Sequence, residues 1–131
     1  MKNLFLICFL LSFNTVLFGQ ERSKPFKDGE WLKYKMSYSG FFKAGTAELT
    51  LKETDLNGKK VFHAKGFGKT SDFIGWFFKV RDTYQSYFDY TEVAPYLFKR
   101  DVNEGGYIIK RDILFNQETK IATVEDFKYN T

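Results

Sequence analysis

The residues best suited to binding or catalysis are three pairs in which an arginine directly precedes an aspartate: Arg81-Asp82, Arg100-Asp101 and Arg111-Asp112. A guanidinium group keeps its charge at neutral pH and binds carboxylates or phosphates through a planar set of donors. Adjacent residues of a β-strand point to opposite faces of the sheet. In strands, each pair would therefore place its arginine on one face and its aspartate on the other.

The pairing of the last two segments follows from the turn between them. Gly105-Gly106 makes a favourable two-residue hairpin loop because glycine tolerates positive φ. With that loop Glu104 faces Tyr107, and opposite charges meet across the strands, Lys99 with Asp112 and Asp101 with Lys110. The same register sets Arg100 directly against Arg111, on the face that carries Phe98, Val102, Ile109 and Ile113.

Two opposed arginines on an apolar face are costly unless an anion joins them. Asp82 is the nearest candidate, since Val80, Asp82 and Tyr84 share a face of the preceding segment. We therefore expect Asp82, Arg100 and Arg111 to form one cluster on the concave face. Two interpretations are open: an internal network that fixes the register, or an arginine left for the carboxylate, phosphate or sulfate head group of a ligand.

Alternation of apolar and polar residues predicts the strands that would position this cluster. Strands are predicted at 31–38, 45–52, 60–68, 80–88, 95–104, 107–115 and 120–129, with Asn57-Gly58 as a strong hairpin signal. No repeated βαβ pattern is present. The sequence thus predicts an all-β fold, an antiparallel meander that forms a half-barrel or open barrel with one short helix.

The helix is predicted over 70–78, where Ser71 can act as the cap and Asp72 suits the first turn. The Asn57-Gly58 register also places Ala47, Leu49 and Leu51 opposite the small residues Gly68, Gly66 and Ala64. The space this leaves is filled either by the helix or by a ligand. The helix, apolar nearly all round, is a plug over one end of the barrel, a mobile lid over an acyl cavity or a membrane-touching patch.

No catalytic or metal site is predicted. His63 is the only histidine, and the hairpin register puts it on the polar face opposite Lys52, as an ordinary surface residue. A metal site needs several ligands together, and a catalytic triad would need His63 itself. A hydrolase using Glu48 or Asp82 is disfavoured because no two carboxylates pair convincingly. The sequence therefore predicts no enzyme and no cofactor.

The N-terminus predicts export. Lys2 is followed by an apolar run from Leu4 to Phe13 and then by Gly19, the order of a secretory signal peptide over 1–19. The run is short for a membrane span, so no stable span is expected after cleavage. The alternative is that the segment stays uncleaved as a membrane anchor. Cys8 is the only cysteine and lies inside the signal. The remaining single β domain, 20–131, is expected to fold without disulfides in the periplasm or outer envelope.

Composition narrows the partners. The formal net charge is +4 and the charges are interspersed, which disfavours nucleic acid because its binders cluster their basic residues. The sequence has sixteen Phe, eight Tyr and two Trp, and only four of the Phe lie in the predicted signal peptide; this enrichment suits strands.

Several segments carry a family resemblance: GEWLKY (29–34), AGTA (44–47), DFIGWFFKVRD (72–82), YQSYFD (84–89), FKRD (98–101) and EGGY (104–107). In order, they resemble the domain-of-unknown-function 3108 family of exported bacterial envelope proteins. The resemblance implies a mostly β fold similar to periplasmic lipoprotein carriers and other half-barrels that hold acyl chains. It implies no reaction. Family members usually run longer, so we expect this chain to be truncated at its C-terminus.

These observations favour a periplasmic, non-enzymatic binding or carrier-type module for an amphipathic, lipid-like ligand. Aromatic walls would hold the tail, and Arg100 or Arg111 would hold an anionic head. The candidate ligand-binding residues are Asp82, Arg100, Arg111, Tyr84, Trp76 and Phe77. The alternative is a structural envelope protein with a filled core that acts through a protein partner, such as one bound along an open sheet edge.

Export gives the first testable prediction. Protein recovered from the envelope fraction of a bacterial host should begin close to Gln20, because a signal peptidase would cut after Gly19. N-terminal sequencing measures this directly. A soluble cytoplasmic product that retains Met1 would contradict the prediction.

Overall fold

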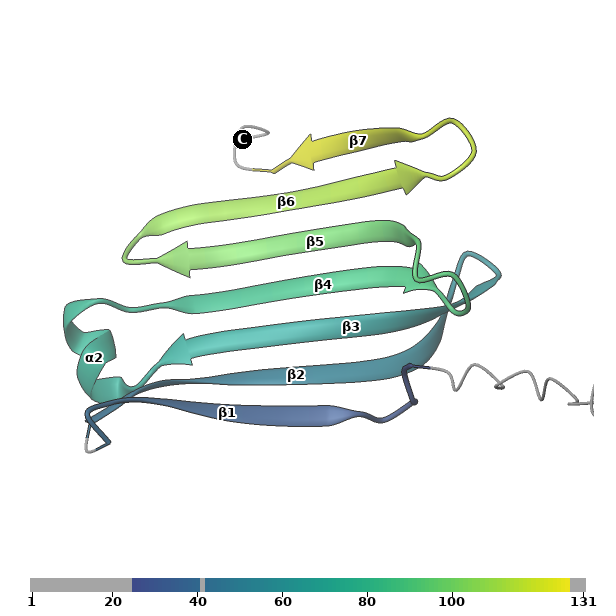
Figure 1. Ribbon diagram of the computed structural model, residues 1–131. Helices are drawn as coiled ribbons and strands as arrows, with labels where there is room; N and C mark the ends of the chain where they lie inside the picture. The colour runs from purple at the N-terminus through teal and green to yellow at the C-terminus, as the bar shows by residue number, and fades with distance from the viewer. Residues whose placement is uncertain (1–24, 41, 128–131) are drawn as a thin grey trace, which may run out of the picture.

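The computed structural model describes residues 25–40 and 42–127, which form one seven-stranded antiparallel sheet (Figure 1). The strands pair in chain order, so the predicted meander is confirmed. Their bounds are β1 Trp31–Tyr38, β2 Phe42–Leu56, β3 Lys59–Thr70, β4 Arg81–Asp89, β5 Pro95–Glu104, β6 Tyr107–Asn116 and β7 Ile121–Asp126. One short helix, α2 Asp72–Phe77, connects β3 to β4.

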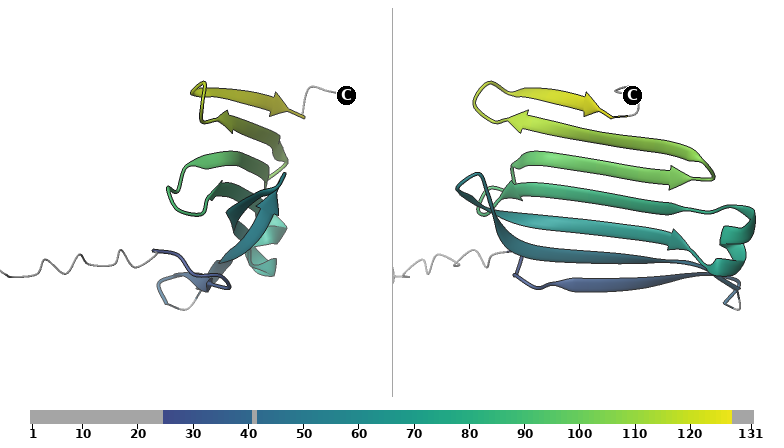
Figure 2. Two further views of the ribbon diagram at one scale, coloured as in Figure 1. Left: turned by 90° about the vertical axis from the view of Figure 1, so that its right-hand side faces the viewer. Right: turned by 180° about the vertical axis from the view of Figure 1, so that it is seen from behind.

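The sheet is twisted and does not close. The end-on view in Figure 2 shows β1 and β7 at opposite edges. Within the described ranges each of these strands has a neighbour on one side alone. The predicted half-barrel is thus an open sheet with two free edges.

The two glycine turns set the registers that the sequence predicted. Asn57 and Gly58 have φ values of 54° and 82°, and Leu49 lies opposite Gly66 as expected. Gly105 and Gly106 have φ values of 59° and 93°, and Arg100 lies opposite Arg111. Positive φ at both loop positions matches the twist of the strands, so each hairpin closes in one register.

Most strand ends lie within two residues of the prediction, and β2 and β7 differ most. β2 continues to Leu56, whereas the predicted strand ended at 52. β2 begins at Phe42, earlier than expected, because a register shift between Met36 and Ser37 lets its first residues continue pairing with β1. β7 ends at Asp126, whereas the predicted strand extended to 129. Residues 128–129 and the predicted signal peptide, 1–19, lie outside the described residues.

The helix forms where its cap residues predicted it. The Ser71 side chain accepts a hydrogen bond from the Ile74 amide at 3.4 Å, and Asp72 occupies the first turn. Yet α2 lies at one end of the sheet, and none of its residues is buried (Figure 1). The interpretation that it fills space on the core face is therefore wrong, since its local sequence determines that a helix forms but not where it packs. No helix in the described ranges is long and apolar enough to cross a bilayer.

The segment after α2 is tied to the tip of the β5–β6 hairpin. The Gly105 amide donates to the Lys79 carbonyl at 2.8 Å, and Val80 forms a bridge with Glu104. The ring of Phe78 lies so close to Gly105 that a Cβ there would be 2.3 Å from its Cε2. Gly105 is thus required by both its positive φ and this contact.

The compact part of the core lies away from α2 and centres on Phe62, which is 2% exposed. Its ring stacks on Tyr90 at 4.8 Å and meets Phe88 at 5.7 Å and Phe26 at 6.0 Å. Phe26 precedes β1, and the backbone that follows it is tied to β2. The Gly29 amide donates to the Leu51 carbonyl at 3.0 Å, and the Leu51 amide donates to the Glu30 carbonyl at 2.9 Å. The N-terminal segment therefore caps one end of the apolar face.

The second prediction concerns this core. Phe62→Ala should lower the free energy of unfolding by roughly 3–5 kcal/mol, because it removes a buried ring and leaves a cavity. Leu114→Ala is the control, since Leu114 is 44% exposed, and should cost less than about 1 kcal/mol. Urea unfolding measures both. Equal losses would mean that Phe62 is not the centre of the core.

Candidate ligand-binding site

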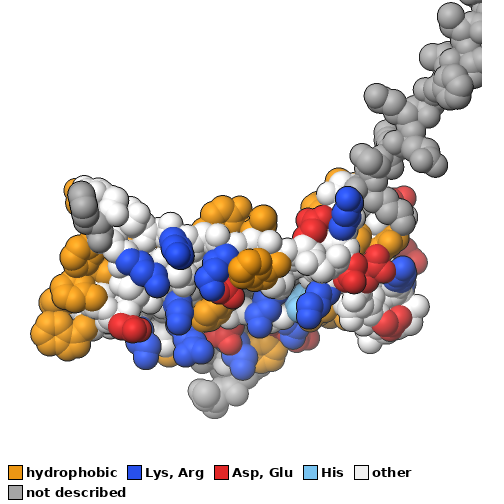
Figure 3. All heavy atoms as spheres, turned by 90° about the horizontal axis from the view of Figure 1, so that it is seen from below, with side chains coloured by type: hydrophobic (Ala, Val, Ile, Leu, Met, Phe, Trp, Pro, Cys, Tyr) orange, Lys and Arg blue, Asp and Glu red, His pale blue; other side chains and the backbone are white. Residues whose placement is uncertain are grey.

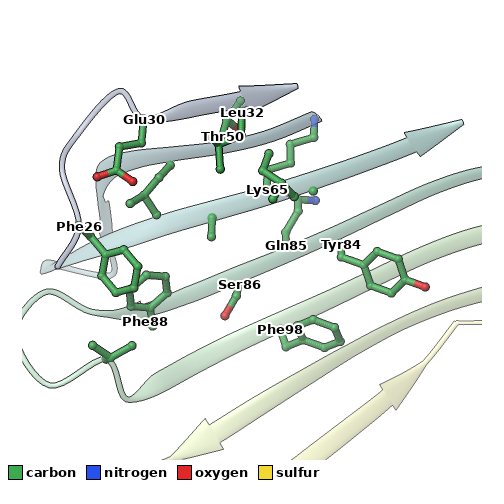
Figure 4. A pocket seen from close by; sticks show the side chains of 15 residues that line it. Phe26, Glu30, Leu32, Thr50, Lys65, Tyr84, Gln85, Ser86, Phe88 and Phe98 are labelled. Carbon is green, nitrogen blue, oxygen red and sulfur yellow. The ribbon is translucent and has the colours of Figure 1, made fainter. Parts of the chain in front are cut away.

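A hollow of about 480 Å³ crosses the apolar face of the sheet (Figure 4). We call it the apolar trough. Its walls come from β1 to β5 and from the segment before β1, and include Phe26, Leu32, Leu49, Leu51, Ala64, Gly66, Tyr84, Ser86, Phe88 and Phe98. This volume lies within the range of about 300–1,000 Å³ that is usual for small-molecule sites. The trough is therefore large enough, and apolar enough, to bind a small molecule.

The trough exists because small residues face large ones across the strands. Gly66 lies opposite Leu49, and Ala64 lies opposite Leu51. A Cβ at Gly66 would approach Leu49 Cδ2 to 3.2 Å, so a larger side chain there would crowd the wall. Leu49 is 43% exposed, and no residue of α2 lines the trough. The space predicted from the hairpin register is thus present and open.

Arg100 lies at the rim of the trough. It follows the lining residue Phe98 by two positions and faces the lining residue Tyr84 across the strands. Its guanidinium carbon is 5.8 Å from the centre of the Tyr84 ring, a cation–π contact. The Nε atom is buried and has no hydrogen-bond partner among the described residues. A buried donor without an acceptor is costly, so this side chain is incompletely compensated within the described residues.

Arg111 has an anion of its own. Its Nε donates to Asp126 Oδ2 at 3.0 Å, and its Nη2 forms an ion pair with the same oxygen. Asp126 comes from β7, where it lies opposite Arg111. The sequence interpretation missed Asp126 because it derived no register for the last hairpin.

Asp82 shares the face of the two arginines but does not bridge them in any contact of the described residues. It is 9% exposed, and its Oδ1 accepts a hydrogen bond from the Asn103 amide at 3.1 Å. The pairing on this face therefore differs from the expected network. Asp82 binds backbone, Asp126 pairs with Arg111, and Arg100 Nε keeps no partner.

The six predicted ligand-binding residues separate into two groups. Asp82, Tyr84, Arg100 and Arg111 lie on neighbouring strands with their side chains on the apolar face. Trp76 and Phe77 belong to α2 at the end of the sheet, where they are 82% and 69% exposed, and they do not line the trough. One site cannot include all six.

The opposite face of the sheet carries His63, Gln85 and Glu48 together with apolar side chains such as the buried Val61. His63 Nε2 lies 2.9 Å from Gln85 Oε1, and its ring stacks on Tyr87 at 4.3 Å. Burial lowers the pKa of His63, although the Gln85 contact acts to raise it. Glu48 pairs with Lys33 at 2.6 Å on this face, whereas Asp82 is on the other, so these two carboxylates do not meet. Across 25–40 and 42–127 no three His, Cys, Asp or Glu residues gather as a metal site would require.

These features define the protein as an open antiparallel β-sheet with an apolar trough on one face and an arginine at its rim. The chain belongs to the family described as "Protein of unknown function (DUF3108)", whose model matches residues 33–131. The resemblance seen in the sequence is thereby confirmed. No curated protein and no solved structure matches the chain.

The third prediction tests the state of Arg100. Arg100→Met should leave the free energy of unfolding unchanged or raise it by about 1 kcal/mol, because the buried Nε without an acceptor is removed. Arg111→Met is the matched control. It should lower the free energy by about 1 kcal/mol, since Asp126 loses a half-exposed ion pair. A loss above about 2 kcal/mol for Arg100→Met would show that Arg100 has a stabilising partner within the protein.

Proposed function

We propose that the protein is an exported, non-enzymatic binding or carrier module for an amphipathic, lipid-like molecule with an anionic head group. The observation that carries the proposal is the apolar trough with the Arg100 guanidinium at its rim. An acyl tail would lie along Leu49, Gly66 and Phe98. Its contact with these walls replaces water on apolar surface, which favours binding.

The head group would lie at Arg100. A carboxylate or phosphate there would accept hydrogen bonds from the terminal guanidinium nitrogens. The Tyr84 ring supports the cation at 5.8 Å, so the guanidinium is already oriented beside the trough. Arg111 already has a carboxylate in Asp126, which favours Arg100 as the arginine that binds the ligand.

The proposed location is the periplasm or the outer envelope, and it rests on the signal-like order of residues 1–19. A carrier catalyses no reaction. The proposed binding depends only on burial of the apolar tail and on pairing of the anionic head group with Arg100. The second candidate is an envelope protein that acts through a protein partner. The edge strand β1 favours it, because all eight of its residues are exposed and one side of its backbone is unpaired within the described ranges.

Mass spectrometry of protein purified from its native envelope separates the two candidates. A carrier should release a stoichiometric acyl-containing anion when the protein is denatured in organic solvent. If the protein carries no lipid and does not bind a fluorescent fatty acid, the carrier proposal is wrong and the second candidate, action through a protein partner, is favoured.

The fourth prediction places the ligand in the trough. Gly66→Leu should weaken binding of a fluorescent fatty acid by roughly tenfold or more, because the new side chain fills the trough beside Leu49. Gly68→Leu is the matched control: the residue lies on the same strand and face, does not line the trough and has open space around its Cβ. Fluorescence titration measures affinity, and far-ultraviolet circular dichroism checks the fold. Equal affinities of the two variants would place the ligand elsewhere.

The head group is tested with the same assay on Arg100→Met. The wild-type protein should bind the fatty acid more tightly than its methyl ester, by roughly tenfold for one charged hydrogen bond. Arg100→Met should remove this difference while leaving the ester affinity unchanged. A difference that persists in the variant would exclude Arg100 as the head-group residue.

A further inference from the structure

Aromatic side chains gather where α2 meets the start of β2. We call this group, formed by Phe42, Phe73, Trp76 and Phe77, the aromatic end. These residues are 44%, 59%, 82% and 69% exposed, respectively. Their rings contact one another edge to face, with centroids 5.0 Å apart for Phe42–Phe73, 5.8 Å for Phe73–Phe77 and 4.8 Å for Trp76–Phe77.

The aromatic end does not belong to the core. The helix α2 has no buried residue, and none of the four rings of the aromatic end belongs to the Phe62 cluster. Figure 3 shows hydrophobic side chains collected at the left end of the molecule, with lysine and arginine side chains beside them across the face in view. A contiguous apolar surface of this kind marks a site of interaction.

The backbone holds this end in place. The Ser71 amide donates to the Ala44 carbonyl at 2.8 Å, and the Val80 amide donates to Thr70 Oγ1 at 3.1 Å. The Gly105 amide anchors the segment that follows the helix through Lys79 O. The aromatic end is therefore presented in a fixed position, and little ordering is required when it binds.

Cations surround a groove of about 420 Å³ beside Trp76. Lys69, Lys79 and Arg81 line it, together with one carboxylate, Asp72. Lys69 and Arg81 face each other directly across β3 and β4, an arrangement of like charges that is unfavourable without a neutralising anion. None of the three cations forms an ion pair within the part of the chain that the structure describes.

We propose that the aromatic end and these three cations together bind the surface of an anionic phospholipid bilayer. Trp76 and Phe77 would enter the boundary between head groups and acyl chains, where tryptophan is favoured. Lys69, Lys79 and Arg81 would then meet the lipid phosphates, and the opposed pair would gain the anion it lacks. This inference concerns a surface apart from the apolar trough and does not rest on the proposed function.

Tryptophan fluorescence tests the proposal on the Trp31→Phe protein, in which Trp76 is the remaining tryptophan. The vesicles contain either phosphatidylcholine alone or equal parts of phosphatidylcholine and phosphatidylglycerol. Trp76 emission should move to shorter wavelength with the anionic vesicles, and the protein should sediment with them. Raising the salt concentration should weaken this binding because the surface charges are screened.

Two sets of variants separate the contributions. Trp76→Ser with Phe77→Ser should lower sedimentation with anionic vesicles by about tenfold or more, and Ile121→Ser, at a residue 61% exposed on β7, is the control. Changing Lys69, Lys79 and Arg81 to Gln should lower it roughly five-fold per charge. The charge-matched control changes the exposed Lys52, Lys110 and Lys120 to Gln.

The proposal is overturned if the anionic vesicles cause no shift of Trp76 emission, or if either set of variants binds as its control does. In that case the aromatic end would suit a protein partner instead. Fatty acid binding by the Trp76→Ser, Phe77→Ser protein is measured in parallel. Its retention shows that the trough is intact, so a failure of membrane binding and a failure of ligand binding are distinguished.

Discussion

Two glycine-containing turns determine most of what this sheet presents. A side chain in a strand changes face with every residue, so a slip of one position would invert the apolar and polar faces of a whole strand. Asn57-Gly58 and Gly105-Gly106 prevent that slip because both pairs adopt positive φ in two-residue loops. The trough walls and the opposed arginines follow from these registers. The positions of the trough walls and of the opposed arginines therefore depend first on the backbone conformation of the four turn residues.

The same reasoning explains how much the sequence could predict. The strands, the helix and both glycine-turn registers depend on local patterns, and they were predictable. The partner of Arg111 was not, since the connection from Asn116 to Ile121 carries no two-residue turn signal that fixes a register. Asp82 shows another limit. Its face was predictable, but its hydrogen bond to the Asn103 amide depends on how β4 and β5 are staggered. The packing position of α2 could not be predicted either. Ser71 and Asp72 determine only that a helix starts there, whereas its position depends on tertiary contacts.

Arg100 and Arg111 show two solutions to one electrostatic problem. Like charges opposed across two strands raise the energy of the folded state unless each finds compensation. For Arg111 the compensation is a carboxylate on the next strand. For Arg100 it is an aromatic ring, which attracts the cation but accepts no hydrogen bond from the buried Nε. The difference arises from position: Arg111 has β7 beside it, whereas Arg100 has Tyr84 of β4. The affinity of Arg100 for an anion would therefore depend on how much stabilisation the anion gives the guanidinium beyond that from the Tyr84 ring.

The contact between Phe78 and Gly105 links two regions that are distant in the sequence. Because the ring lies where a Cβ would be, and the Gly105 amide bonds to Lys79, the β5–β6 hairpin tip and the segment after α2 form one unit. A displacement of the helix must either break these contacts or carry the hairpin with it. That hairpin bears Arg100 and Arg111. The end of the sheet that carries α2 and the two strands that carry the arginines are therefore held together by backbone contacts as well as by the chain itself.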